Sequence, residues 1–316
     1  MPSLNKKFFV FTYHSVAPDS SKPFVSIPWF DIRVKSEIFE KHLQYYLKNF
    51  CLIGEKELIS NVFPVSNKPY GILTFDDGYV DNYSYAFPLL CKYKVPAIFF
   101  PVVDAIEKNA ILWDNLFLEI TYQLNTDQLK EFFSSKIKDI ENIHSKEQCI
   151  KHIADFIKYK INSQAERISW VKQLSEFSNF KLQERQRYLT IPQCLEMQKS
   201  GLVTFGSHTL SHCILNHSHE FENEICLSKK LLEDKLDKPI HSICYPSGGY
   251  NQSVTKVCAN TGYKMGFTVE PGFNSLTLLN NFEIKRFHIG NINKYHLIFE
   301  LSGWKHKISE KFKGKS

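Results

Sequence analysis

The chain has 316 residues, 43% of them hydrophobic, which is enough to bury the core of one large α/β domain or of two ordinary ones. Lysine and arginine outnumber aspartate and glutamate by 39 to 33, and the resulting net charge of +6 is too small and too dispersed to indicate a nucleic-acid-binding protein. The eight cysteines form no CxxC pair, so the sequence predicts neither a zinc ribbon nor a disulfide framework and favours a reducing, cytoplasmic compartment.

The N-terminal apolar run begins after Lys6 and Lys7 and is cut off by Tyr13-His14-Ser15 without a small-residue cleavage site. It is therefore interpreted as a first strand rather than a signal peptide. No run of about 18 apolar residues occurs, and no transmembrane helix is expected. The lysine-rich tail over 305–315 is expected to be solvated, with a peripheral contact at the inner face of a membrane as the alternative.

The first third of the chain alternates between strand and helix patterns. Aromatic and β-branched residues predict a strand over 7–15, and apolar positions at helical spacing predict a helix over 36–49. A strand over 71–76, a helix over 80–93 and a strand over 95–103 follow. This order is the βαβ pattern of a parallel sheet or barrel.

From about 105 to 200 the sequence changes to long amphipathic helical patterns, which we interpret as a helical insertion with helices at 115–124, 127–138, 146–161 and 164–180. The alternation then resumes, with strands expected at 202–205, 240–245, 263–269 and 283–289 and helices at 220–236, 252–260 and 294–304. About seven strands result. The sequence therefore predicts a single α/β domain over 1–316, a β/α barrel with its site at the carboxyl ends of the strands.

Two adjacent carboxylates, Asp76 and Asp77, stand where the apolar run Gly71–Phe75 ends in a glycine turn. Neighbouring carboxylates repel each other, and burying both requires a cation, a shared proton or solvent. This stretch therefore predicts a functional site at a strand end.

A second strand end carries His208 and His212, four residues apart, so that on a helical turn both imidazoles face the same side. Two imidazoles and one carboxylate can hold Zn²⁺ or a related divalent ion and leave a position for water or substrate. Either histidine alone is more simply explained by hydrogen bonding within a loop. The pair, together with Asp76 and Asp77, favours a metal site.

A third strand end, Ile243–Tyr250, breaks into a proline and two glycines. By itself it predicts only a tight turn. Beside a metal site, its backbone N–H groups become candidates to bind a developing oxyanion.

Taken in order, Thr-Phe-Asp-Asp-Gly at 74–78, Ser-His-Thr-Leu-Ser-His at 207–212 and Tyr-Pro-Ser-Gly at 245–248 resemble motifs of the polysaccharide deacetylases of carbohydrate esterase family four, the NodB homology group. The resemblance covers about 7–103 and 188–289 and leaves the helical block outside. It implies a distorted (β/α)7 barrel that removes acetyl groups from sugars with a divalent metal ion, which we expect to be Zn²⁺.

The resemblance also implies roles, carried over by motif position. Asp76 is then the general base, and Asp77, His208 and His212 are the metal ligands. The metal is expected to lower the pKa of a bound water towards about 7, and the backbone N–H of Ser247 is expected to hold the oxyanion.

Two positions depart from the family pattern. Many relatives carry an arginine that orients the base where this chain has Cys244. Arg286, on the last predicted strand, is the candidate replacement, with an ordinary ion pair as the alternative. No Leu-x-His motif follows the third motif, so another histidine has to protonate the leaving amine. His14 resembles the acid of the circularly permuted poly-N-acetylglucosamine deacetylases, and it is preferred over His288.

The sequence thus predicts an N-deacetylase acting on an N-acetylated sugar in a glycan or in a lipid-linked or nucleotide-linked precursor. Tyr79, Trp113 and Tyr250 are candidates to stack on the sugar, with ordinary packing as the alternative for each. A sugar O-acetyl esterase uses the same tetrahedral chemistry and stays open. A catalytically inactive carbohydrate-binding barrel would fit the missing arginine, although the retained Asp76 argues against it.

Overall fold

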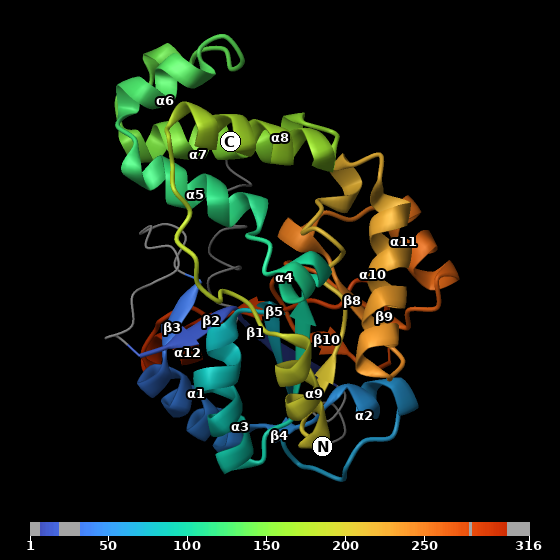
Figure 1. Cartoon of the computed structure of the whole chain (residues 1–316). Coiled ribbons are helices and arrows are strands. Elements are labelled where there is room, and N and C mark those ends of the chain that lie inside the picture. Colours follow the sequence, from blue (N-terminus) through green and yellow to red (C-terminus); the bar gives the residue numbers. More distant parts are fainter. Residues whose placement is uncertain (1–6, 19–31, 278–279, 302–316) are drawn as a thin grey trace, which may run out of the picture.

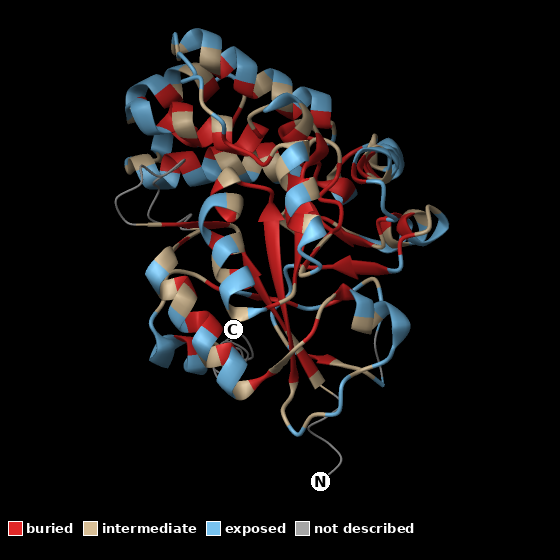
Figure 2. Ribbon diagram, turned by 60° about the horizontal axis from the view of Figure 1, so that its bottom comes forward, coloured by how far each residue is buried: buried red, intermediate tan, exposed pale blue. Residues whose placement is uncertain are grey.

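The computed structural model describes residues 7–18, 32–277 and 280–301, and the lysine-rich tail with Trp304 lies outside the described residues. Figure 1 shows strands at the centre of the molecule, helices around them and a separate block of helices, α5 to α8, stacked at one end. The central strands run towards this block (Figure 2), so the block covers the carboxyl ends of the barrel strands.

Parallel strands form the barrel wall in an order that closes into a ring. Strand β1 pairs in parallel with β5 on one side and β11 on the other, and β5, β6 and β7 are successive parallel neighbours. Strands β8 and β9 pair with each other, and isolated bridges Ser207–Ile243 and Phe267–Ile284 join this pair to the rest. The structure thus has the (β/α)7 barrel that the sequence predicts.

Short strands decorate this wall, with β10 antiparallel to β1, β4 beside β5, and β2 paired with β3. The strands are β1 (Lys7–Tyr13), β2 (Ser15–Ala17), β3 (Arg33–Lys35), β4 (Cys51–Leu52), β5 (Tyr70–Asp77), β6 (Ala97–Pro101), β7 (Val203–Phe205), β8 (Ser242–Cys244), β9 (Met265–Phe267), β10 (Asn274–Ser275) and β11 (Phe287–His288).

Helices cover the outside of the wall and turn their buried faces inward (Figure 2). They are α1 (Ser36–Asn49), α2 (Glu55–Ser60), α3 (Phe87–Tyr93), α4 (Val103–Lys108), α5 (Trp113–Gln123), α6 (Thr126–Phe133), α7 (Lys146–Lys160), α8 (Gln164–Phe177), α9 (Ile191–Lys199), α10 (Phe221–Leu236), α11 (Gln252–Asn260) and α12 (Lys294–Leu301).

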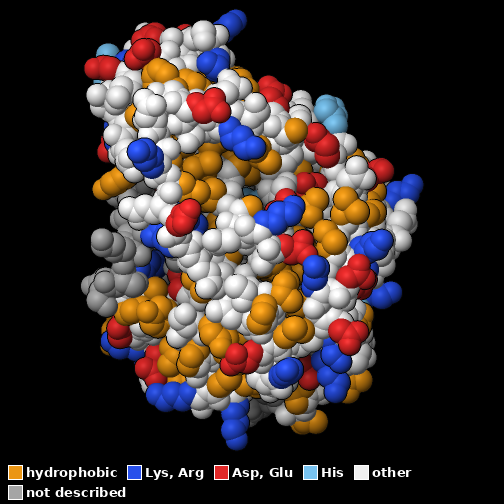
Figure 3. All heavy atoms as spheres, viewed as in Figure 1, with side chains coloured by type: hydrophobic (Ala, Val, Ile, Leu, Met, Phe, Trp, Pro, Cys, Tyr) orange, Lys and Arg blue, Asp and Glu red, His pale blue; other side chains and the backbone are white. Residues whose placement is uncertain are grey.

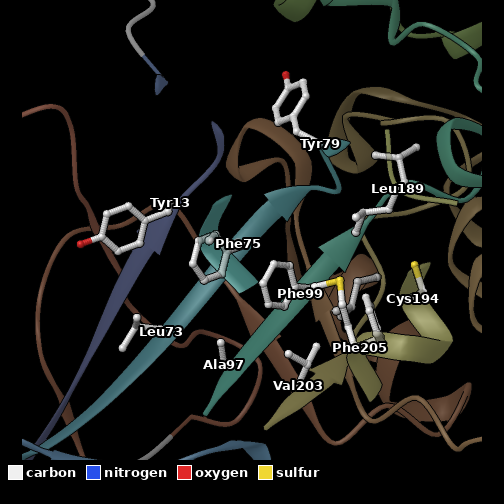
Figure 4. Close-up of a cluster of buried hydrophobic side chains, with 14 of the residues drawn as sticks. Tyr13, Leu73, Phe75, Tyr79, Ala97, Phe99, Leu189, Cys194, Val203 and Phe205 are labelled. Atoms are coloured by element: carbon white, nitrogen blue, oxygen red, sulfur yellow. The ribbon is translucent and has the colours of Figure 1, made fainter. Parts of the chain in front are cut away.

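The barrel core is rich in stacked aromatic rings (Figure 4). Phe75 of β5 stacks on Phe99 of β6 with ring centroids 4.5 Å apart, and Phe11 of β1 stacks on Tyr46 of α1 at 4.0 Å. All eight residues of β5 are buried, as expected for a parallel strand covered on both faces. Its apolar side chains Ile72, Leu73 and Phe75 each stabilise the fold by roughly 1.5–3 kcal/mol, which anchors the strand that carries Asp76 and Asp77.

Some predicted helices differ from the observed ones. The helix predicted over 80–93 is present over these residues, but it contains a wide turn of π-helix, Asn82–Ala86, before α3. Pro88 stands in the first turn of α3 and has no N–H to donate to the carbonyl oxygen four residues earlier, which accounts for the widened turn. Helix α6 ends at Phe133, five residues before the predicted end at Lys138.

The helical block is smaller than the predicted insertion over 105–200. Residues between Trp113 and Phe180 pack into a hydrophobic cluster of their own. Ile106 of α4 and Met197 of α9 instead belong to the barrel cluster. Amphipathic patterns do not distinguish inserted helices from barrel helices, because both bury one apolar face.

Basic and acidic side chains are interspersed on the face shown in Figure 3. No helix within the described part of the chain is both long and apolar enough to cross a bilayer.

Candidate active site

A pocket of about 580 Å³ lies at the carboxyl ends of the barrel strands and extends to the helical block. Every residue predicted for catalysis or metal binding lines it, namely His14, Asp76, Asp77, His208, His212, Ser247, Arg286 and the alternative acid His288. The helical block adds Asp114, Asn115, Lys158 and Tyr159. The barrel therefore brings the ends of β1, β5, β7, β8 and β11 to one place, as parallel strands in a ring must.

Strained backbone conformations gather at this pocket. Asp77 has a φ of 67°, His212 of 59° and Ser247 of 52°, all in the left-handed region. Each such residue costs of order 1–3 kcal/mol, so the surrounding structure has to hold it in place. Gly78 permits the turn after the two carboxylates, because a Cβ there would lie 2.8 Å from Cβ of Pro101. Concentrated strain of this kind is typical of a functional site.

Asp77, His208 and His212 direct potential ligand atoms at one another. Oδ1 of Asp77 lies 3.4 Å from Nε2 of His208 and 3.6 Å from Nε2 of His212, and all three side chains are buried. Donors about 2.0–2.1 Å from a tetrahedral ion lie roughly 3.3–3.4 Å apart. Nδ1 of His208 donates to the carbonyl oxygen of Cys244 at 2.8 Å, which leaves the Nε2 lone pair available. The donor set and its spacing therefore fit a divalent metal ion.

The two histidines converge without the helical turn that their spacing predicts. The stretch after β7 is a loop turn in which Thr209, with a φ of 66°, and His212 are left-handed. Oγ1 of Thr209 accepts the N–H of Cys213 at 3.0 Å and closes the turn. The imidazole centroids lie 5.1 Å apart, so this turn brings the two rings together as a helical turn would.

Charges around Asp77 offset the cost of burying it. Burial by itself raises the pKa of Asp77, but the hydrogen bond from His208 and the neighbouring histidine charges outweigh burial and hold that pKa well below its usual range. Burial lowers the pKa of His208, and its contacts with Cys244 and Asp77 reverse this and raise the pKa. The carboxylate of Asp77 and the imidazole of His208 thus stabilise each other's charged forms.

Asp76 is held by Arg286 through two parallel hydrogen bonds. Nη1 and Nη2 of the arginine each donate to one carboxylate oxygen at 2.8 Å, and Nε donates to the carbonyl oxygen of Thr268 at 2.7 Å. Both partners are 3% exposed, so this is a buried pair in the pocket and not a surface ion pair. Burial raises the pKa of Asp76, but the guanidinium overrides it and lowers that pKa to about 2. Asp76 is therefore ionised at neutral pH.

This geometry accounts for the cysteine at the position of the expected arginine. Sγ of Cys244 contacts Oδ2 of Asp76 at 3.5 Å, and burial raises the pKa of the thiol. Cys244 therefore stays neutral beside the carboxylate, while Arg286, just before β11, supplies the positive charge.

Both candidate acids lie at the pocket. Nε2 of His14 is 3.9 Å from Oδ2 of Asp76, and the rings of His14 and His288 are 5.1 Å apart. His14 is 18% exposed, and its Nδ1 is buried without a hydrogen-bond partner among the described residues. Burial lowers the pKa of His14, and the charges of Asp77 and Asp76 oppose that shift. His288 is exposed at the edge of the pocket.

A buried network fixes the chain on both sides of His14. Oγ of Ser15 donates to Asp81 at 2.5 Å, and the N–H of Val16 donates to the same carboxylate at 3.3 Å. Nδ2 of Asn82 donates to the carbonyl oxygen of His14 at 2.6 Å. Asp81 and Asn82, which follow Asp76 and Asp77 in the sequence, thus position His14 opposite these two carboxylates.

Ser247 lies at the wall of the pocket, in the turn after β8. The N–H groups of Gly248 and Gly249 bond the carbonyl oxygens of Tyr245 and Pro246. The N–H of Ser247 has no acceptor among the described residues. It is therefore the N–H of this turn that remains available to a ligand.

The aromatic residues predicted to face a sugar are used in packing. Trp113 is buried, and its Nε1 donates to the carbonyl oxygen of His212 at 3.1 Å. Tyr79 is buried and stacks on Tyr188 with centroids 5.6 Å apart. Tyr250 donates its hydroxyl to a carboxylate, Glu270. A sugar-stacking role for Trp113 is therefore wrong, because its ring does not face the open pocket.

Sequence reasoning missed two contributions of the helical block. Tyr159, at the end of α7, is 47% exposed and lines the pocket. Oδ2 of Asp114 lies 3.3 Å from Nδ1 of His212, at an angle outside that of an ordinary hydrogen bond. No local signal marks Tyr159, whereas Asp114 is an acidic residue at the first turn of a helix that begins beside the site.

Comparison with known proteins agrees with this geometry. The polysaccharide deacetylase family model matches residues 65–154 and 179–266. The matched segments contain Asp76, Asp77 and the strand ends that bear His208, His212 and Ser247. They include the first part of the helical block up to 154 but leave out 155–178, so the expectation that the block lies outside the family pattern is wrong for its first part only.

A curated relative, the candidate polysaccharide deacetylase YxkH of Bacillus subtilis (strain 168), is 25% identical over 272 residues. The alignment covers 84% of this chain but 66% of the relative. Among solved structures, the Streptococcus pyogenes deacetylase PplD in complex with acetate has a TM-score of 0.59 and 19% identity, over 93% of this chain and 98% of that one. A de-N-acetylase from Aggregatibacter actinomycetemcomitans has a TM-score of 0.58 and 17% identity, over 93% and 100%. These structures show the same fold.

Proposed function

The chain belongs to the polysaccharide deacetylase family, and on this basis we propose that it removes the N-acetyl group from an amino sugar in a metal-dependent hydrolysis. The observation that carries the proposal is that a three-residue ligand set, Asp77, His208 and His212, shares a pocket with the ionised Asp76. The three ligands can hold a cation, and Asp76 can take a proton. Amide hydrolysis by a metal enzyme needs both functions.

The ligand set suits a divalent ion, and we propose Zn²⁺ because two imidazoles and one carboxylate are common zinc ligands. When bound, the ion supplies a Lewis acid that activates water and polarises the acetyl carbonyl. A second group, Asp76 with His208 and Cys244, is less suited. Asp76 already accepts two hydrogen bonds from Arg286, and the raised pKa of Cys244 keeps its thiol protonated.

Asp76 is the proposed general base. It accepts one proton from the attacking water while the water oxygen bonds to the acetyl carbon. Arg286 keeps this carboxylate unprotonated and fixes its direction, because both of its oxygens are held. The base is therefore ready at neutral pH without a change in the protein.

The N–H of Ser247 is the proposed donor to the oxyanion that forms on the acetyl oxygen. His14 is the proposed acid: it donates a proton to the sugar nitrogen as the carbon–nitrogen bond breaks. Acetate and a free amine leave, and the protons gained by Asp76 and lost by His14 are exchanged with solvent. His14 is favoured over His288 because it lies beside Asp76 and is held by the buried network.

The alternative of an inactive sugar-binding barrel loses its main argument, because Arg286 orients Asp76 where the usual arginine is absent. The identity of the sugar and its carrier remains part of the proposal: an N-acetylated sugar in a glycan or in a lipid-linked or nucleotide-linked precursor. Tyr159, an exposed residue that lines the pocket, can face the sugar.

Acetate release from a substrate panel tests the proposal. The panel contains N-acetylated oligosaccharides, nucleotide-linked and lipid-linked N-acetyl sugars, and O-acetylated sugars, each with and without chelator. We expect release from at least one N-acetylated class, its loss with chelator and its return with Zn²⁺. Faster release from the O-acetylated sugars would assign an esterase, and release unaffected by chelator would reject metal dependence.

A further inference from the structure

The loop that carries His212 rests on the helical block as well as on the barrel. Trp113 of α5 donates its Nε1 to the carbonyl oxygen of His212 at 3.1 Å. Gln164 of α8 donates its Nε2 to the carbonyl oxygen of the preceding Ser211 at 2.8 Å. A few residues later, the buried Arg167 donates to the carbonyl oxygen of His217 at 2.7 Å. Helices of the block thus hold this loop at three points.

The imidazole of His212 lies between two carboxylates. Its Nε2 is 3.6 Å from Oδ1 of Asp77, and its Nδ1 is 3.3 Å from Oδ2 of Asp114. Asp114 is 7% exposed, so its charge is poorly screened by solvent. A carboxylate beside Nδ1 favours the tautomer with the proton there, and the lone pair then lies on Nε2, which faces Asp77.

The backbone conformation of this loop requires such support. Thr209 and His212 are both in the left-handed region. Residues with side chains keep this conformation where surrounding contacts enforce it. The contacts to Trp113 and Asp114 restrain the carbonyl and the ring of His212 respectively, so one turn of α5 restrains the backbone and the side chain together.

We propose that the helical block is part of the metal site, with Asp114 and Trp113 as positioning residues that orient His212 towards the ion. The inference rests on the metal site assigned above but not on the reaction. Metal binding and the packing of α5 against the His212 loop are then coupled: bound metal stabilises the packing, and the packing raises the affinity for the metal.

The test measures the affinity of the full-length metal-free protein for Zn²⁺ by competition with a chromophoric chelator. Asp114→Asn keeps the shape of the side chain and removes its charge, and we expect Zn²⁺ affinity to fall about 10- to 100-fold. Asp127→Asn is the matched control, because Asp127 is an exposed residue in the first turn of α6. The control is expected to bind Zn²⁺ like the wild type.

Two further variants separate positioning from folding. Trp113→Phe keeps an aromatic ring in the cluster and removes the indole N–H, and we expect a smaller loss of Zn²⁺ affinity. Asp114→Glu restores the charge, and we expect it to recover part of the affinity that Asp114→Asn loses. Thermal unfolding of each metal-free variant shows whether the fold is kept.

The outcomes distinguish this inference from the proposed function. Wild-type affinity in Asp114→Asn would overturn it, as would equal losses in Asp114→Asn and Asp114→Glu with a folded protein. If Asp114→Asn does not fold, wild-type affinity in the folded Trp113→Phe variant would overturn the inference. A wild-type protein that binds no Zn²⁺ would reject the metal site itself.

Discussion

Replacing Arg286 by methionine should expose the role of Asp76 as a base. The substitution removes the two N–H donors and the buried positive charge that hold Asp76 at a pKa of about 2. Breaking a buried ion pair costs about 3–5 kcal/mol. Without the arginine, the buried carboxylate of Asp76 avoids this cost by taking up a proton. One pKa unit corresponds to 1.36 kcal/mol, so the pKa of Asp76 is expected to rise by about 2–4 units, to about 4–6.

The sign of the effect follows from the protonation state. Wild-type Asp76 is ionised over the whole neutral and mildly acidic range, whereas in Arg286→Met it becomes protonated as the pH falls through its new pKa. The ratio of kcat/KM in the variant to that in the wild type should therefore fall about tenfold per pH unit below that pKa. Above pH 7 the ratio should level off at a value that reflects the lost orientation of the base.

The assay is acetate release from pH 4.5 to 8.5 with both proteins saturated with metal. The ratio is used because loss of metal at acid pH affects both proteins alike. Arg187→Met is the matched control, since Arg187 is also buried but pairs with Glu119 outside the pocket. A ratio for Arg286→Met that does not change with pH would refute the reasoning that Arg286 keeps the base ionised.

Three other substitutions have equally direct outcomes. His14→Ala should lower the single-turnover rate of deacetylation by about 10²–10⁴-fold and His288→Ala by less than tenfold, and near-wild-type rates in both would reject both as the acid. Tyr159→Ala should raise KM about 2- to 12-fold with little change in kcat, because an aromatic contact contributes roughly 0.5–1.5 kcal/mol. Tyr122→Ala is the control, since Tyr122 lies on α5 outside the pocket, and it should leave KM unchanged. Burial raises the pKa of Asp81 from 3.8 to about 7. Between pH 3.8 and pH 7 the folded protein therefore keeps a proton on Asp81 that the unfolded chain has lost, and the free energy of unfolding falls as the pH rises. Asp81→Asn removes this dependence, and denaturant midpoints at pH 5 and pH 7.5 should show wild-type stability falling relative to the variant; parallel changes would contradict it.

Long, strongly patterned elements could be predicted from the sequence with their bounds, whereas short strands could be located but not bounded. The predicted bounds of α1 and α11 agree with the structure, because their apolar positions recur at helical spacing between clear ends. Strands β8, β9 and β11 have two or three residues, and isolated bridges join them into the ring. A segment of two or three residues has no period to detect, so the runs predicted at 240–245, 263–269 and 283–289 contain these strands but overestimate their lengths.

The site was easier to predict than the barrel that builds it. His14, Asp76 and Asp77 each follow an apolar strand, and parallel strands bring their carboxyl ends together, so position along the chain was informative. The bond from Arg286 to Asp76 and the contact of Asp114 with His212 join residues about 100 to 210 positions apart. Such pairings depend on the tertiary packing of strands and helices, which local sequence patterns do not encode.

Comparing Asp76→Asn with Asp77→Asn tests the central claim most directly, because these adjacent residues are assigned different tasks. Metal content and metal-dependent acetate release are measured on both purified variants. The account predicts that Asp76→Asn keeps its metal and loses about 10²–10⁴-fold in rate, whereas Asp77→Asn loses the metal and the activity together. Wild-type activity in Asp76→Asn, or a full metal complement in Asp77→Asn, would contradict it.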